Sequence, residues 1–196
     1  DFESPNFVFQ LALMHITKKI DGSLSKLMKK NYLTPVGIRS RPSDANGYNS
    51  KGYHTGCVWP FITMSASLAN CNYENTENVK MLMDINIANF GKQSVNGINE
   101  IFGGDNYMPL GCTSQAWSVA GLLEVIDSYF LGINPKMTEK MVIIDPSNFN
   151  FKQFKREMKI GRRTAKFFYK KKGDKLELKV ENLPVIGKIP NVYKNC

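Results

Sequence analysis

The sequence predicts a mainly α-helical protein that ends in a small β module, and three observations lead to that fold class. Up to about residue 135, apolar residues recur every three to four positions, as they do along one face of a helix. In Lys175–Glu181, apolar residues alternate strictly with charged ones, which is typical of a strand with one buried face. The charge divides in the same way, because residues 1–136 hold eleven basic and eleven acidic side chains while residues 137–196 hold fifteen and six. We therefore expect a helical domain over residues 1–136 and a small basic β domain over residues 137–196.

Helical periodicity predicts five helices in the first domain. The first begins at Pro5, which a first helical turn tolerates, and ends where Asp21-Gly22-Ser23 interrupts the pattern. Gly91 follows the fourth helix as a left-handed capping residue. The fifth helix is apolar around most of its circumference, so we expect it to be buried nearly all round. The expected ranges are 5–20, 24 to about 34, 58–72, 77–90 and 116–131.

Two long polar connections, residues 37–55 and 91–111, each lead into a helix. Connections of this length in a compact protein are usually functional.

After Pro135 the hydrophobic period changes, and Met141–Ile144 is a short apolar run. Residues 164–170 are aromatic and β-favouring, and a Lys-Gly-Asp turn joins them to the alternating segment, so we expect a β-hairpin there.

The composition excludes several classes of protein. The chain has 196 residues, 42% of them hydrophobic and 22% charged, and a net charge of +9, which fits a globular protein and excludes a disordered or collagen-like one. No stretch approaches the roughly 18 consecutive apolar residues that a membrane-spanning helix needs. Because residue 1 is Asp rather than Met, we expect a truncated N-terminus, from which a targeting signal cannot be read.

The four cysteines, Cys57, Cys71, Cys112 and Cys196, lie far apart, without a Cys-x-x-Cys pair or a histidine at zinc-ligand spacing. We expect buried or partly buried free thiols, no metal and no cofactor, and a cytoplasmic location. Two disulfides of a secreted protein are the alternative.

Aromatic, imidazole and amide side chains gather where the two connections meet their helices. Rings stack on the apolar faces of sugars and polar tips meet their hydroxyl groups, so this combination suits a neutral, hydroxyl-rich ligand. Glu100 adds a carboxylate of the kind that activates water as a general base. The residues expected to bind substrate are Tyr53, His54, Trp59, Gln115 and Trp117. For His54, Trp59 and Trp117 the alternative is a structural role in the core.

These two stretches carry a resemblance to a known family. A Tyr-His-x-Gly-x-Val-Trp-Pro sequence at residues 53–60 is followed by Glu-Ile-Phe-x-Gly at residues 100–104 and by Gly-Cys-x-x-Gln-Ala-Trp-Ser at residues 111–118. Together they resemble the C-terminal part of amylo-α-1,6-glucosidases, the glucosidase part of glycogen-debranching enzymes. Ser-Pro-Asn at residues 4–6 and Leu-Thr-Pro-x-Gly-Ile-Arg-Ser at residues 33–40 extend the resemblance over residues 4–135.

The resemblance implies the C-terminal portion of an (α/α)6 barrel of the glucoamylase-like superfamily, with about five helices. It further implies an inverting glycosidase that releases glucose from α-1,6 branch points of glycogen-like glucans, in which Glu100 is the general base. The general acid would lie in a missing N-terminal part, so we expect this chain alone to be inactive. Asp105 is the alternative base, although Gly-Gly-Asp-Asn is typical of a turn.

Two other functions remain as alternatives. One is a non-catalytic glucan-binding or structural module of the same fold, and the other is a related glucoamylase-type or trehalase-type specificity. The lysine cluster at residues 170–172, next to the aromatic residues 167–169, raises a third possibility, nucleic-acid binding. Lysine is also the ordinary residue on the solvent-exposed face of a hairpin, so nucleic acid is the less favoured partner.

A partial barrel exposes apolar faces, which predicts self-association or a companion segment that covers them.

Overall fold

The computed structural model describes residue 5, residues 21–183 and residues 186–188 of the chain. These residues form two compact units, divided between Val125 and Ile126. The first helix is expected over residues 5–20, and all of that range except residue 5 lies outside the described residues. No helix of the described residues is long and apolar enough to cross a membrane.

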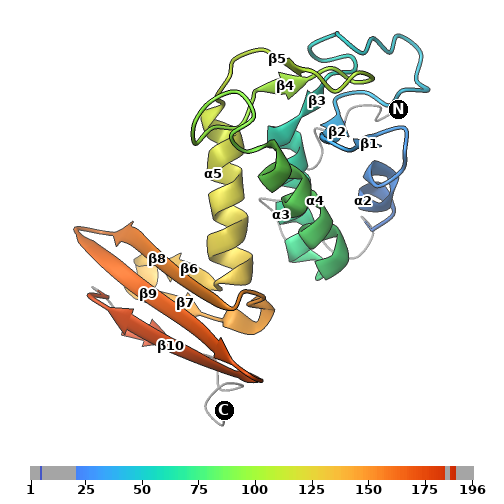
Figure 1. Ribbon diagram of the computed structural model, residues 1–196. Helices are drawn as coiled ribbons and strands as arrows, with labels where there is room; N and C mark the ends of the chain where they lie inside the picture. The colour runs from blue at the N-terminus through green and yellow to red at the C-terminus, as the bar shows by residue number, and fades with distance from the viewer. Residues whose placement is uncertain (1–4, 6–20, 184–185, 189–196) are drawn as a thin grey trace. The chain divides into compact units, whose positions relative to one another are not determined.

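The first unit contains the helices that surround its core. Pro60 occupies the first turn of α3, where its missing N–H costs nothing, and α3 and α4 pack side by side as an antiparallel pair (Figure 1). The expected helices at residues 58–72 and 77–90 are confirmed to within two residues at their starts and ends. Residues 21–23, expected to interrupt a helix, lie inside one. The helices are α2 (Asp21–Leu27), α3 (Pro60–Asn72), α4 (Thr76–Asn89) and α5 (Ala116–Glu124), and a π-helical segment (Val125–Phe130) follows α5.

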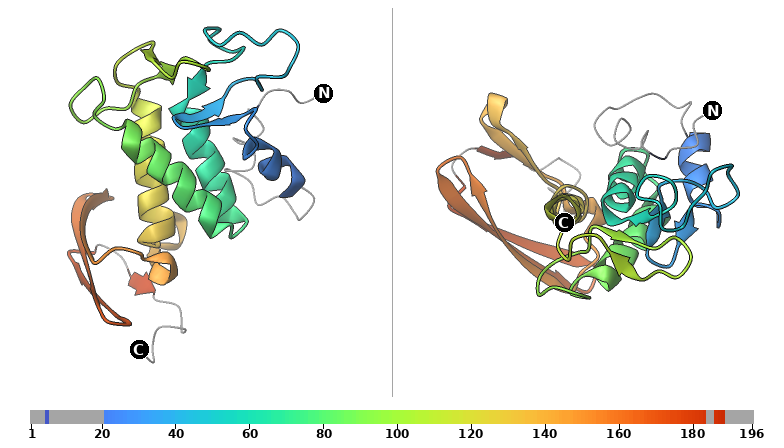
Figure 2. Two further views of the ribbon diagram at one scale, coloured as in Figure 1. Left: turned by 45° about the vertical axis from the view of Figure 1, so that its right-hand side comes forward. Right: turned by 90° about the horizontal axis from the view of Figure 1, so that it is seen from above.

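A small five-stranded antiparallel sheet joins the two long connections, which sequence periodicity had left without structure. Strand β3 leads directly into α3, and the sheet lies at the end of the unit where α3 begins, as the left view of Figure 2 shows. The register places Ile38 opposite Trp59 and Val58 opposite Phe102. In order across the sheet, the strands are β1 (Leu33–Thr34), β2 (Gly37–Arg39), β3 (Val58–Trp59), β4 (Ile101–Phe102) and β5 (Pro109–Leu110).

Arg39 connects the sheet to the surrounding loops. Its side chain is only 6% exposed, and its Nε donates to the carbonyl oxygen of Gly104 at 3.0 Å. Its Nη1 donates to the carbonyl oxygens of Lys30 and Asn31 at 3.0 and 3.2 Å. A buried guanidinium is tolerated only when its donors are used in this way. One side chain therefore fixes the segment after α2 against the second long connection.

Helix α5 departs from the expectation of burial all round. Ser118 and Leu122 are buried, whereas Trp117 is 63% exposed and Leu123 is 41% exposed within this chain. The prediction of an apolar helix is confirmed, but the periodicity of a sequence does not show how many other helices or strands pack against it. The expected self-association or companion segment stays a prediction.

The second unit is built almost entirely of strands. The predicted hairpin is confirmed: β9 and β10 pair in antiparallel fashion, and Gly173 occupies the turn at φ +60°. One sheet has the order β10-β9-β8, and in the other β7 pairs in antiparallel fashion with β6 and in parallel fashion with β11. The strands are β6 (Ile133–Lys136), β7 (Met141–Ile144), β8 (Gln153–Ile160), β9 (Arg163–Lys172), β10 (Lys175–Glu181) and β11 (Ile186–Lys188), and 3-10 turns lie at Met137–Glu139 and Pro146–Asn148.

An ion pair and an aromatic core hold this unit together. Arg156 binds Asp127 through two hydrogen bonds, Nε to Oδ1 at 2.6 Å and Nη2 to Oδ2 at 2.8 Å. This bidentate geometry keeps the pKa of the Arg156 guanidinium above its usual value. Phe167 and Tyr169 are fully buried, and the Tyr169 hydroxyl donates to the carbonyl oxygen of Leu131 at 2.8 Å.

The expectation of a mainly α-helical chain is therefore wrong, and no five-helix portion of an (α/α)6 barrel is present in the described residues. Four α-helices are accompanied by three sheets. The reason is physical: strands of two residues leave no periodic signal in the long connections, and the second unit is nearly all strand.

Gly132 gives a test of packing in the second unit. It has φ +65°, and a Cβ there would lie 1.8 Å from the carbonyl oxygen of Asp145, whereas Gly161 has φ +60° and open space around it. Gly161→Ala should cost only the backbone strain of about 1 kcal/mol. Gly132→Ala should cost at least about 2 kcal/mol more, because the backbone at Asp145 must move. Urea unfolding followed by circular dichroism measures both, and equal losses would contradict this packing.

Candidate functional site

A hollow of about 450 Å³ lies at the starts of α3 and α5, under the end of the first long connection. All five residues expected to bind substrate line it. Two further lining residues, Phe61 and Ile62, were not expected. They belong to the first turn of α3, directly after Trp59 and Pro60, and that position was the signal that could have identified them. The complete lining is Tyr53, His54, Trp59, Phe61, Ile62, Gln115 and Trp117.

Three rings form one wall of the hollow. The Tyr53 ring meets Trp59 edge to face with centroids 4.6 Å apart, and it meets His54 at 4.7 Å. The His54 and Trp59 rings are parallel at 5.6 Å. The indole N–H of Trp59 donates to the carbonyl oxygen of Tyr53 at 2.8 Å, so the buried indole supports the more exposed tyrosine and histidine. Trp59 thus serves the core and the hollow at once.

The opposite wall comes from the helix starts. Phe61 and Trp117 pack with their ring centroids 5.1 Å apart. The backbone N–H of Gln115 donates to the carbonyl oxygen of Ile98 at 2.7 Å, which fixes the start of α5 against the second connection. The Gln115 side chain makes no capping hydrogen bond, so its amide is not used to close the helix.

Glu100 lies beside this hollow rather than in its lining. Its Oε1 accepts a hydrogen bond from the hydroxyl of Tyr53, and its Oε2 accepts one from the backbone N–H of Cys112 at 3.0 Å. A second bond, from the Glu100 N–H to the Cys112 carbonyl oxygen at 3.0 Å, fixes the backbone as well. Tyr53 therefore connects the carboxylate to the aromatic wall.

These bonds set the protonation of both partners. The hydroxyl of Tyr53 and the N–H of Cys112 hold the pKa of Glu100 below its usual value of 4.5. The same carboxylate, together with burial, raises the pKa of Tyr53 to about 12. At neutral pH the pair is an ionised carboxylate and a protonated phenol. Each carboxylate oxygen keeps a further lone pair that can accept a hydrogen bond from water.

Asp105, the alternative base, has a different environment. Its Oδ1 accepts a hydrogen bond from the hydroxyl of Tyr48 at 2.7 Å and lies 3.9 Å from Nη2 of Arg39. Burial and this bond raise the pKa of Tyr48 to about 12. The carboxylate holds the two long connections together, and it does not line the hollow.

Nothing in the described residues forms a group of three or more His, Cys, Asp or Glu side chains suited to a metal ion. Three of the cysteines are free thiols: Cys57 is buried, Cys71 is partly buried and Cys112 is exposed. The exposure of Cys112 differs from the expectation. The fourth, Cys196, lies outside the described residues.

Comparison with known families identifies a match to more than half of the chain. The family model described as amylo-alpha-1,6-glucosidase matches residues 4–124, which is more than half of the chain. The match contains every residue of the hollow and Glu100, and it ends next to the boundary between the two units. No curated protein matches the sequence.

The link between Tyr53 and Glu100 predicts the titration of the carboxylate. Because Tyr53→Phe removes one of the two donors, the pKa of Glu100 should rise from below 4.5 toward that usual value. Carbon-13 NMR of the labelled glutamate carboxyl groups measures the shift. Tyr48→Phe is the matched control, since it removes a tyrosine hydroxyl that binds Asp105 instead. An unchanged Glu100 pKa in Tyr53→Phe, or the same rise in Tyr48→Phe, would show that the hydroxyl does not hold the carboxylate.

Proposed function

The chain belongs to the amylo-α-1,6-glucosidase family, and we propose that it forms part of a glycoside hydrolase that releases glucose from α-1,6 branch points of glycogen-like α-glucans. The observation that carries the proposal is the hollow itself. Four aromatic rings, an imidazole and an amide line it, and an ionised carboxylate accepts a hydrogen bond from Tyr53 in its wall. Such rings and polar groups bind a sugar, and the carboxylate is of the kind that activates water.

In the proposed mechanism Glu100 is the general base of an inverting hydrolysis. Its carboxylate takes a proton from water while the water oxygen attacks the anomeric carbon and the bond to the branch-point oxygen breaks. A carboxylic acid on the other side of the sugar gives its proton to that oxygen. The two carboxyl groups of such enzymes are about 6.5–9.5 Å apart, which leaves room for the water.

Tyr53 has a second role in this proposal, as a positioning residue. The phenol holds the Glu100 carboxylate ionised and directs one oxygen, so that the base is ready before substrate arrives. The low pKa makes Glu100 a weaker base but keeps it in the form that can accept a proton. His54 and Gln115 would bind sugar hydroxyls, and Trp117, which is 63% exposed, would stack on a sugar face.

We propose that the general acid comes from outside this chain. In the part of the chain that the structure describes, none of the residues that line the hollow is a carboxylic acid. The same observation favours a second candidate, a glucan-binding module that does not itself perform the reaction. Replacement of Glu100 in the complete protein distinguishes the two candidates. Turnover is lost if this chain supplies the general base, and it is kept if this chain only binds glucan.

Replacement of Glu100 is the direct test. In the complete protein, Glu100→Gln should lower turnover on a branched dextrin at least about 100-fold, because positioned acid and base groups contribute about 10²–10⁴-fold. Maltooligosaccharide binding should persist, since the amide keeps the size of the carboxylate. Glucose release by coupled assay measures the first and titration calorimetry the second.

Asp105→Asn is the matched control for this test. It replaces the acid that binds Tyr48 on the same connection, and it should keep most of the turnover. Near-normal activity of Glu100→Gln, or an equal loss in Asp105→Asn, would contradict the assignment. The 196-residue chain alone should release no glucose.

A further inference from the structure

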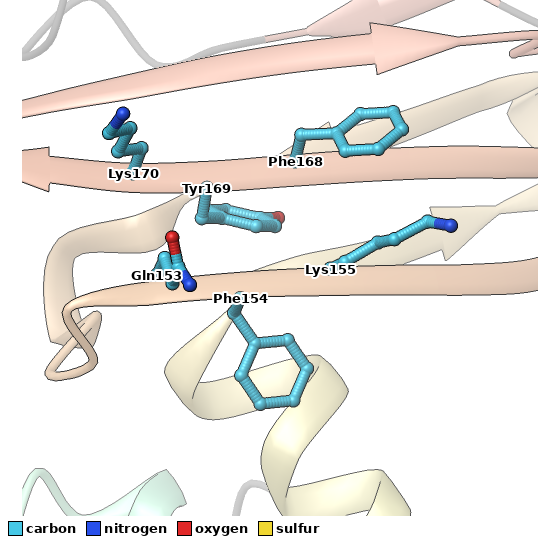
Figure 3. Close-up of a pocket in the computed structure, with 6 residues that line it drawn as sticks. All are labelled: Gln153, Phe154, Lys155, Phe168, Tyr169 and Lys170. Atoms are coloured by element: carbon cyan, nitrogen blue, oxygen red, sulfur yellow. The ribbon is translucent and has the colours of Figure 1, made fainter.

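A second hollow, of about 530 Å³, lies on the three-stranded sheet of the second unit, between β8 and β9 (Figure 3). The register puts Lys155, Phe168 and Lys179 directly opposite one another across the three strands. Gln153 and Lys170 form the adjacent pair. The hollow is lined by Gln153, Phe154, Lys155, Phe168, Tyr169 and Lys170.

Phe168 is unexpected on this face. Along β9 the residues Ala165, Phe167 and Tyr169 are buried in the core, so Phe168 projects from the opposite face with the lysines on either side of it. It is half-buried there, and the ammonium groups of Lys155 and Lys179 lie 5.8 and 5.9 Å from its ring centre. The result is one apolar ring with cations around it, inside a hollow.

The charges on this face are unequal. Three glutamates alternate with seven lysines across the outer positions of the three strands, and each glutamate has a lysine nitrogen within 4 Å. These pairs lower the pKa values of Glu157, Glu177 and Glu181. Among the described residues, no carboxylate lies that close to the Lys170 nitrogen, and none lines the hollow. The hollow therefore presents cations and an amide to a ligand that carries oxygen acceptors.

The arrangement distinguishes between anionic ligands. A continuous polyanion such as a nucleic acid would meet the three glutamates along with the lysines. Phe168 is the single ring at the outer positions of the three strands, because Phe167 and Tyr169 are buried and Phe154, opposite Tyr169, lies on the other face. A polymer with isolated phosphate groups needs only a local cation with a hydrogen-bond donor beside it, as Lys170 and Gln153 are here. A sugar ring matches the single phenyl ring, since its C–H face stacks on aromatic side chains.

We propose that this hollow is a second glucan-binding site, which takes phosphate-bearing residues of an α-glucan chain. Phe168 stacks on the sugar, Lys170 and the neighbouring Gln153 bind the phosphate, and Lys155, at the other end of the hollow, binds a hydroxyl group (Figure 3). The site rests on the proposed function, because it binds the same polymer that the proposed reaction acts on.

Affinity electrophoresis of the 196-residue chain tests this site. The gel contains amylopectin that carries phosphate monoesters, or the same polymer after phosphatase treatment. We expect the chain to bind the phosphorylated polymer at least threefold more tightly, with a preference that declines as salt is added. The double variant Lys155→Gln/Lys170→Gln should lose the preference, and Phe168→Ser should weaken binding to both polymers.

Lys26→Gln/Lys80→Gln is the matched control, because it removes two exposed lysines of the first unit, one of them paired with an acid as Lys155 is. The control should keep the preference. Equal binding of the two polymers, an equal loss in the control, or tighter binding of a single-stranded oligothymidylate would overturn the proposal.

Glu100→Gln separates this proposal from the proposed function. The variant should keep the phosphate preference, because the sheet of the second unit contains none of the residues around Glu100. If the complete protein keeps its turnover with this substitution while the phosphate preference persists, the catalytic assignment fails and the second site stands.

Discussion

The candidate site depends on the buried guanidinium of Arg39. Three backbone carbonyl groups and one carboxylate surround it, drawn from the segment after α2 and from the second long connection. Because a buried charge without partners is costly, these segments are held in the one arrangement that satisfies it. Arg39 itself sits on β2, next to β3, which ends at Trp59. A single side chain thereby ties together the loops that carry the tyrosine and the carboxylate.

The register of β3 against β4 completes that arrangement. Val58 pairs with Phe102, so Tyr53 and Glu100, which precede these strands, approach each other from two connections far apart in sequence. Successive side chains of a strand point to opposite faces of the sheet, so a shift of one residue in the register would move each side chain of the strand to the other face. The two strands contain only two residues each, and the hydrogen bonds of Arg39 and of Cys112 supply the precision that such short strands lack.

The sequence predicted the composition of the hollow better than the fold around it. Tyr53, His54 and Trp117 were recognisable because rings and polar tips lay at helix starts, and chemistry of that kind is visible without a structure. Strand β8 was not predicted, because Arg156 occupies an inward-facing position and breaks the alternation of Phe154, Met158 and Ile160. It can do so only because Asp127, 29 residues earlier, neutralises it. The contact of Tyr53 with Glu100, like the hollow around Phe168, depends on register, which no local pattern contains.

The bond between Tyr53 and Glu100 also defines the range of acidity over which the site stays assembled. Because folding lowers the pKa of the Glu100 carboxylate, the bond contributes its full stabilisation of the folded state above pH 4.5. That stabilisation is lost as the pH falls through the lower pKa of the folded protein. Because folding raises the pKa of the Tyr53 phenol, the stabilisation is fully present below pH 10.0 and is lost as the pH rises through about 12. Between these limits neither partner changes charge. The hydrogen bond between Tyr53 and Glu100 is therefore insensitive to pH within that range, and any pH dependence there must come from groups other than this pair.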